Sequence, residues 1–98
     1  MYNIPEKVLI TAKRVKEIVK SIDPTAKVYL FGSATRGELT ALSDIDILVL
    51  TERTNLKYEI MVKVYKNVKE PIELHVVNEK YLEVWYKRFI RSEELIEV

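Results

Sequence analysis

The chain has 98 residues, 48% hydrophobic and 32% charged, which is typical of one ordered globular domain over residues 1–98. Sixteen lysines and arginines against fifteen acids give a net charge of +1, so bulk charge indicates neither a nucleic-acid nor a membrane partner. The lack of cysteine excludes disulfides, thiolate zinc sites and cysteine nucleophiles. Apolar runs are far shorter than the roughly 18 residues of a membrane span, and the first residues lack a signal peptide's apolar centre. We therefore expect a cytoplasmic protein.

The first half of the chain predicts one helix and two strands. The helix has a start signal at residues 3–6, with Asn3 as the expected cap, and ends at residues 23–24, where proline disfavours the helical conformation. Its apolar face recurs every three or four residues, at Val8, Ala12, Val15, Val19 and Ile22. Short apolar, β-branched runs predict strands over residues 27–31 and 45–50.

The second half predicts helix, strand and helix. Thr54 or Asn55 is the expected cap of a helix whose apolar face carries Leu56, Ile60, Val64 and Val68. A strand follows over residues 71–77, and Asn78 is the expected cap of the last helix. Core packing is the preferred role of the aromatic residues there, Tyr81, Trp85, Tyr86 and Phe89. The state of residues 92–98 is open. The fold class is α/β, a small mixed sheet with helices packed on it.

The turn after the first strand has the features of a phosphate site. Gly32 follows the strand directly, and residues 33–36 can form one helical turn closed by Gly37. Free backbone N–H groups and a positive helix end attract phosphate there. Ser33 would add a hydroxyl donor and Arg36 a charged fork. An ordinary tight turn is the alternative.

Two aspartates open the second strand. Asp44 and Asp46 are two residues apart, so their side chains share one face and their charges repel. A divalent cation relieves this repulsion, and oxygen ligands suit Mg²⁺ or Mn²⁺, which also bridge to substrate phosphates. Two solvated aspartates are the alternative.

The third strand supplies a further acid. Because Ile72, Leu74 and Val76 share one face, Glu73 and His75 point to the other. If this strand lies beside the aspartate strand, three carboxylates converge and can hold two Mg²⁺ ions for phosphoryl or nucleotidyl transfer. His75 is interpreted as a structural or supporting group rather than a ligand.

These residues resemble a known signature. The pattern consists of Gly32-Ser33, ten further residues and then Asp44-x-Asp46, with Arg36-Gly37 and Ser43 between. It is similar to that of the DNA polymerase β-like nucleotidyltransferase superfamily, in its minimal nucleotidyltransferase (MNT) branch. The resemblance covers nearly the whole chain, because the order of helices and strands also fits that catalytic core.

The resemblance implies roles for individual residues. Gly32 and Ser33 would bind the terminal phosphates of a nucleotide, while Asp44, Asp46 and Glu73 would bind the metal ions and act in catalysis. Glu73 departs from the family, which commonly has aspartate there. MNT proteins are often paired with HEPN-domain partners in toxin–antitoxin systems, where some transfer AMP to a tyrosine of the partner.

Two functions from different classes follow. The favoured one is a Mg²⁺-dependent nucleotidyltransferase that moves AMP from ATP, or the corresponding group of another NTP, onto a hydroxyl of a HEPN-type partner with which it assembles. A chain of 98 residues leaves little room to hold an acceptor, so the acceptor must bring its own binding surface. The alternative is a binding module that neutralises a partner by occlusion, without catalysis. Eleven lysines and twelve glutamates also suit the surface of a thermophile's protein.

Overall fold

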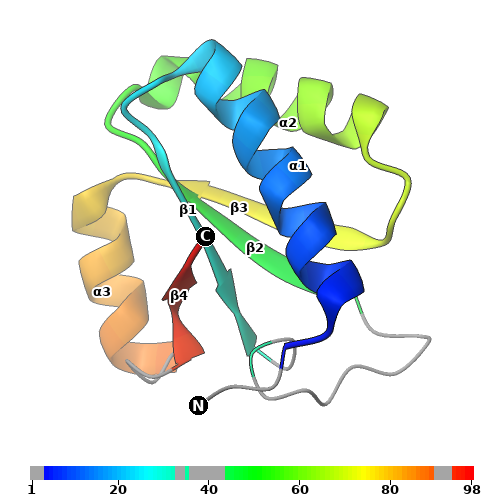
Figure 1. Cartoon of the computed structure of the whole chain (residues 1–98). Helices are drawn as coiled ribbons and strands as arrows, with labels where there is room; N and C mark the ends of the chain where they lie inside the picture. The colour runs from blue at the N-terminus through cyan, green and yellow to red at the C-terminus, as the bar shows by residue number, and fades with distance from the viewer. Residues whose placement is uncertain (1–3, 33–34, 36–43, 90–93) are drawn as a thin grey trace.

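The sheet of this protein has four strands in the order β3-β2-β1-β4 (Figure 1). The computed structural model describes residues 4–32, 35, 44–89 and 94–98, apart from the side chains of residues 86, 87 and 89. In these ranges the elements are α1 (Glu6–Ile22), β1 (Lys27–Phe31), β2 (Ile45–Leu50), a 3-10 turn (Thr54–Leu56), α2 (Lys57–Asn67), β3 (Ile72–Val77), α3 (Glu79–Phe89) and β4 (Ile96–Glu97). Within them, no helix is both long and apolar enough to cross a membrane.

The strand pairing makes the sheet mixed, as the sequence predicts. β1 runs antiparallel to both β2 and β4, whereas β2 and β3 are parallel. Asp46 is the register partner of Phe31 on one side and of Glu73 on the other. The predicted convergence of the two acidic strands is therefore confirmed.

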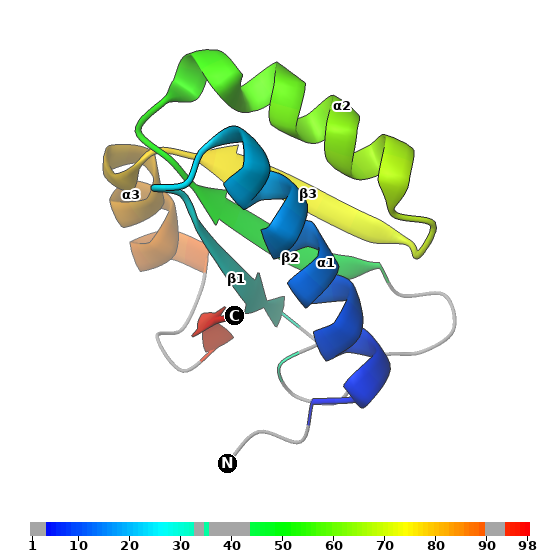
Figure 2. The same cartoon turned by 45° about the horizontal axis from the view of Figure 1, so that its top comes forward.

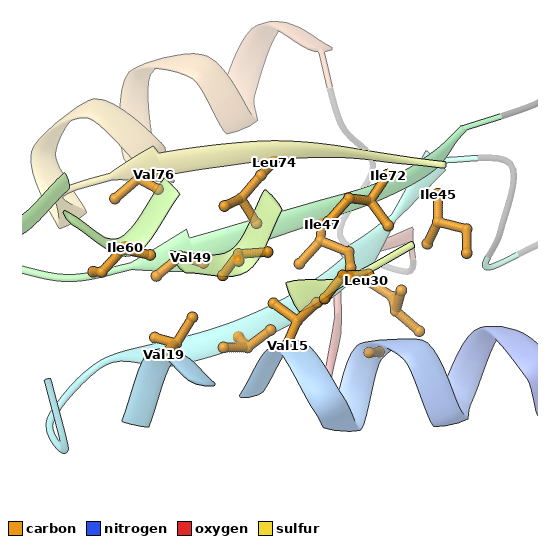
Figure 3. Close-up of a cluster of buried hydrophobic side chains, with 14 of the residues drawn as sticks. Val15, Val19, Leu30, Ile45, Ile47, Val49, Ile60, Ile72, Leu74 and Val76 are labelled. Carbon is orange, nitrogen blue, oxygen red and sulfur yellow. The ribbon is translucent and has the colours of Figure 1, made fainter. Parts of the chain in front are cut away.

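One face of the sheet is covered by α1 and α2, which lie side by side over it (Figure 2). Val15 and Val19 of α1 and Ile60 of α2 are fully buried there. They face the alternate strand residues that the period-two pattern places inward, among them Leu30, Ile45, Ile47, Val49, Ile72, Leu74 and Val76 (Figure 3). This burial fixes the register of β2 and β3, because a slip by one residue would turn these side chains to the opposite face.

The opposite face is covered in part by α3. Leu82 and Trp85 pack against buried Phe31, Leu48 and Val77, which confirms a core role for these two helix residues. Tyr81 is 58% exposed, so the expectation that it belongs to the core is wrong. Its position one residue before Leu82 turns it away from the sheet. The expected packing of Tyr86 and Phe89 lies outside the described side chains.

The helix starts differ from the sequence prediction in two places. α2 begins after a 3-10 turn with Leu56 at its N-cap position, so neither Thr54 nor Asn55 caps it. At α1 the N-cap position is Pro5, whose carbonyl accepts from Val8 N at 3.0 Å, and the expected cap Asn3 lies outside the described residues. The Asn78 cap is confirmed, since its Oδ1 accepts from Tyr81 N at 2.8 Å.

The last described residues add a short strand. Ile96 and Glu97 pair with Leu30 and Tyr29 of β1, which makes β4 an edge strand of the sheet. β3 is the other edge strand, and its Leu74 N donates to the hydroxyl of Tyr65 on α2 at 2.9 Å.

Asp23, at the end of α1, ties this helix to the segment after β2. Its carboxylate is buried and accepts from Thr25 Oγ1 at 2.6 Å, from Thr25 N at 3.0 Å and from Thr51 Oγ1. Arg53 Nε lies 3.9 Å away. The hydrogen bond from the Thr25 side chain, followed by that from Thr51, holds the pKa of Asp23 below its usual value.

We predict that Asp23→Asn lowers the free energy of unfolding by about 1.5–3 kcal/mol at pH 7, because an amide nitrogen cannot accept the hydroxyl bonds of Thr25 or Thr51. The lowered pKa means that the native carboxylate stabilises the fold above about pH 4 and loses this effect as the pH falls through its native pKa. Urea unfolding at pH 7 and pH 3 should therefore show the difference shrinking in acid. Glu17→Gln, at an exposed acid of α1, is the control. Equal stability of wild type and Asp23→Asn at pH 7 would contradict the prediction.

Candidate active site

The site begins where β1 ends. Gly32 has a φ of +74°, in the left-handed region that favours glycine. A Cβ at this position would lie 2.7 Å from Asp46 Oδ2, so the backbone of Gly32 passes directly against the carboxylate. Buried Thr35 donates its hydroxyl to Gly32 O at 2.7 Å and so closes the turn. The other predicted phosphate-binding residues, Ser33, Arg36 and Gly37, lie outside the described residues.

Asp46, Glu73 and His75 form the centre of the site. Each offers one ligand atom, and these atoms all lie within 4.8 Å of one another. All three side chains are on the α3 face, because their neighbours Ile45, Ile47, Ile72 and Leu74 fill the opposite face. The structure thus brings together two of the three predicted metal ligands.

Asp44 stands just outside this group. It is exposed immediately before β2 and does not belong to the cluster, although its negative charge acts on Asp46. It lies two residues before Asp46, just ahead of Ile45, the first residue of β2.

His75 is more closely involved than the sequence indicates. Its Nε2 lies 3.6 Å from Glu73 Oε1, and its ring centroid is 5.5 Å from Phe31 and 5.7 Å from Trp85. Phe31 and Trp85 meet edge to face at 5.4 Å, so the three rings form one packed group beside the acids. Sequence spacing shows that Glu73 and His75 share a face but does not reveal the rings that fix the imidazole.

Asp46 has an unusual affinity for protons. Its pKa is raised to about 6, mainly by burial and then by the charge of Glu73 and a hydrogen bond with it, with a smaller contribution from the charge of Asp44. Two further acids, Glu73 and Asp44, thus place negative charge near the partly buried carboxylate. A divalent cation bound there would neutralise this negative charge.

The residues present fit such a cation. Two carboxylates and an imidazole offer ligand atoms that all lie within 4.8 Å of one another. Carboxylate oxygens are the usual ligands of Mg²⁺ and Mn²⁺. Asp46, Glu73 and His75 are thus the described residues that can hold a metal.

A groove of about 390 Å³ runs along the outer side of β3, next to the cluster. His75 belongs to both, so the groove and the cluster are continuous. Its other walls include Tyr81 and Asn78 on the α3 side and Met61 of α2. It lies on the side of Glu73 away from Gly32, because β3 is at the end of the sheet.

We predict that Asp46→Asn stabilises the metal-free protein at neutral pH. The native pKa of about 6 exceeds the ordinary value, so the native state holds its proton more tightly than the unfolded state between about pH 4 and pH 6. The contribution of Asp46 to stability should therefore fall as the pH rises through this window, and the variant should escape that loss. Thermal melting in EDTA at pH 7.5 and pH 4.5 checks this, with a larger advantage of the variant expected at the higher pH. A wild type that gains stability from pH 4.5 to 7.5 relative to the variant would contradict it.

Gly32→Ala should lower stability by about 1–2 kcal/mol from backbone strain alone, with a further loss from its contact with Asp46. A double-mutant cycle with Asp46→Ala separates the two costs, because removing the carboxylate removes the contact and leaves the strain. Urea denaturation of the four proteins is the measurement. Additive losses would show that the closeness of Gly32 and Asp46 has no energetic consequence.

Comparison with known proteins places these residues in a family. The family model described as "Nucleotidyltransferase domain" matches residues 12–98, which include Gly32, Asp44, Asp46 and Glu73. A comparison with curated proteins gives no match.

Two solved structures, both described as a "putative nucleotidyltransferase", resemble the chain. One is 34% identical with a TM-score of 0.68, over 88% of this chain and 95% of that one. The other, from Sulfolobus solfataricus, is 23% identical with a TM-score of 0.51, over 97% of this chain and 88% of that one, and shows the likeness of fold alone. Together with the match to residues 12–98, the first of these shows that the chain belongs to the nucleotidyltransferase domain family.

Proposed function

We propose that this protein transfers AMP from ATP to a hydroxyl group of a partner protein, with divalent metal ions as cofactors. Membership of the nucleotidyltransferase domain family supports nucleotidyl transfer in general. The observation that carries the proposal is the contact between the glycine turn and the aspartate strand, the two parts of the signature. The Gly32 backbone lies against Asp46, and Asp46 faces Glu73, so a triphosphate on the turn would reach the carboxylates.

Each chemical role falls to a named part of the site. The turn at Gly32, with Ser33, Arg36 and Gly37, would hold the terminal phosphates. Asp44, Asp46 and Glu73 would hold two ions, Mg²⁺ in the simplest case. When bound, the ions would neutralise charge on the phosphates and lower the pKa of the attacking hydroxyl.

The reaction is an in-line displacement. The acceptor oxygen bonds to the α-phosphorus of ATP, the bond from that phosphorus to the bridging oxygen breaks, and pyrophosphate leaves. The acceptor's proton passes to solvent. With pyrophosphate on the Gly32 side of the metal centre, the acceptor must approach from the opposite side, which is the side of β3 and its groove.

The groove supports a protein acceptor. Its walls carry aromatic and apolar side chains, including Trp85, Tyr81 and Met61, which suit a side chain or an extended segment of a folded partner. A HEPN-type toxin is the partner we propose, with transfer of AMP acting as neutralisation. Occlusion without transfer is the competing function, and the position of Asp44 outside the cluster favours it.

Glu73→Gln distinguishes the two functions. The variant keeps the shape of the side chain and removes its charge, so AMP transfer should fall at least tenfold, about 1.4 kcal/mol of transition-state stabilisation, while partner binding stays unchanged. The assay incubates the protein with ATP labelled at the α-phosphate, Mg²⁺ and the protein encoded beside it, and follows label on that protein.

The control is Glu59→Gln, at an exposed acid of α2 far from the cluster, which should transfer AMP as the wild type does. A second measurement needs no partner protein. Because Glu73→Gln removes a negative charge, it should lower the pKa of Asp46, which NMR titration can follow. Full neutralisation of the partner with no label transferred by the wild type would overturn the proposal in favour of occlusion.

A further inference from the structure

His75 adds a nitrogen atom to a centre otherwise built from carboxylates. One imidazole nitrogen and one oxygen each of Asp46 and Glu73 lie within 4.8 Å of one another. Neighbouring ligands of an octahedral ion are about 3 Å apart when each bond is about 2.1 Å long. The three side chains can therefore reach one ion with small adjustments of their terminal atoms.

The imidazole is held in place for this contact. Its ring packs against Phe31 and Trp85, at centroid distances of 5.5 and 5.7 Å, so it has little freedom to swing away. Its Nε2 lies 3.6 Å from Glu73 Oε1, which is longer than a hydrogen bond and leaves room for an ion between the two atoms. The packing thus holds Nε2 of His75 beside the acidic side chains.

A nitrogen ligand changes which metal the centre prefers. Mg²⁺ is bound mainly by carboxylates, phosphates and water. Imidazole is a ligand of transition ions, and Mn²⁺, which shares the carboxylate preference of Mg²⁺, accepts a nitrogen ligand more readily than Mg²⁺ does. Building on the proposed function, we propose that His75 is a metal ligand and that it makes this centre bind Mn²⁺ in preference to Mg²⁺.

Zn²⁺ fits the requirements of transfer less well than Mn²⁺. In a tetrahedral site, three protein ligands leave one position open. A centre that must contact both a phosphate and an acceptor oxygen needs at least two open positions. Asp46, Glu73 and His75 would fill three of the six positions of an octahedral Mn²⁺ ion and leave three for these groups.

The test measures metal binding directly, without the transfer reaction. Calorimetric titrations of the metal-free protein with Mn²⁺ and Mg²⁺ are compared for wild type and His75→Phe. Phenylalanine keeps a ring between Phe31 and Trp85 and removes the nitrogen. We expect the affinity for Mn²⁺ to fall at least tenfold and that for Mg²⁺ to change less than threefold. Pulsed EPR of bound Mn²⁺ should show coupling to an imidazole nitrogen in wild type only.

His75→Asn provides a second variant if His75→Phe folds poorly. It replaces the nitrogen donor by an amide oxygen, so the ratio of Mn²⁺ to Mg²⁺ affinity should fall at least tenfold. Unchanged Mn²⁺ affinity in a folded variant, or no nitrogen coupling in wild type, would overturn the role of His75.

Asp46→Asn separates this inference from the proposed function. It should weaken both ions together, because Asp46 is common to the whole centre. If Asp46→Asn binds both ions as wild type does, the metal centre of the proposed function fails, and the inference on His75 fails with it. If only the His75 variants leave binding unchanged, the proposed function stands and the inference alone fails.

Discussion

Asp46 and Glu73 lie opposite one another in the parallel pairing of β2 with β3, and like charges in that position destabilise a sheet. The pairing is held by the other face of the same strands, where Ile47 meets Leu74 and both are buried. A shift of one residue would relieve the acids but would expose the apolar side chains. The apolar core therefore maintains a carboxylate pair that is unfavourable by itself. Burial, together with this pairing, raises the pKa of Asp46. A bound cation would relieve this repulsion, and that relief would add to the free energy of cation binding.

The elements of the fold could be predicted because each carries a local period. Alternation in β3 places Glu73 and His75 on the face opposite Leu74, and helical spacing identifies the buried sides of α1 and α2. The site was predictable to the same extent. Gly32, Asp46 and Glu73 are marked by a glycine after a strand and by acids within apolar strands, and the structure brings these three together.

What the sequence did not predict depends on contacts between distant residues. Asp23 accepts a hydrogen bond from Thr51, 28 residues away, and no local pattern indicates this. The pairing of Ile96 with β1 likewise depends on a free sheet edge, which only the folded topology provides. The part of His75 in the cluster follows from its packing against Trp85 of α3, and side-chain spacing in β3 carries no information on that helix.

The hydroxyl of Tyr65 has a consequence for the behaviour of the protein in concentrated solution. The edge strand of a sheet has unpaired backbone N–H and C=O groups. A strand of another molecule can pair with them, which is a common route to aggregation. In β3 the amide of Leu74, near the middle of the strand, is already bonded to Tyr65 on α2. An incoming strand must break this bond and displace an aromatic ring before it can pair along β3. Tyr65 thus hinders pairing of β3 with a strand of another molecule and disfavours edge-to-edge association.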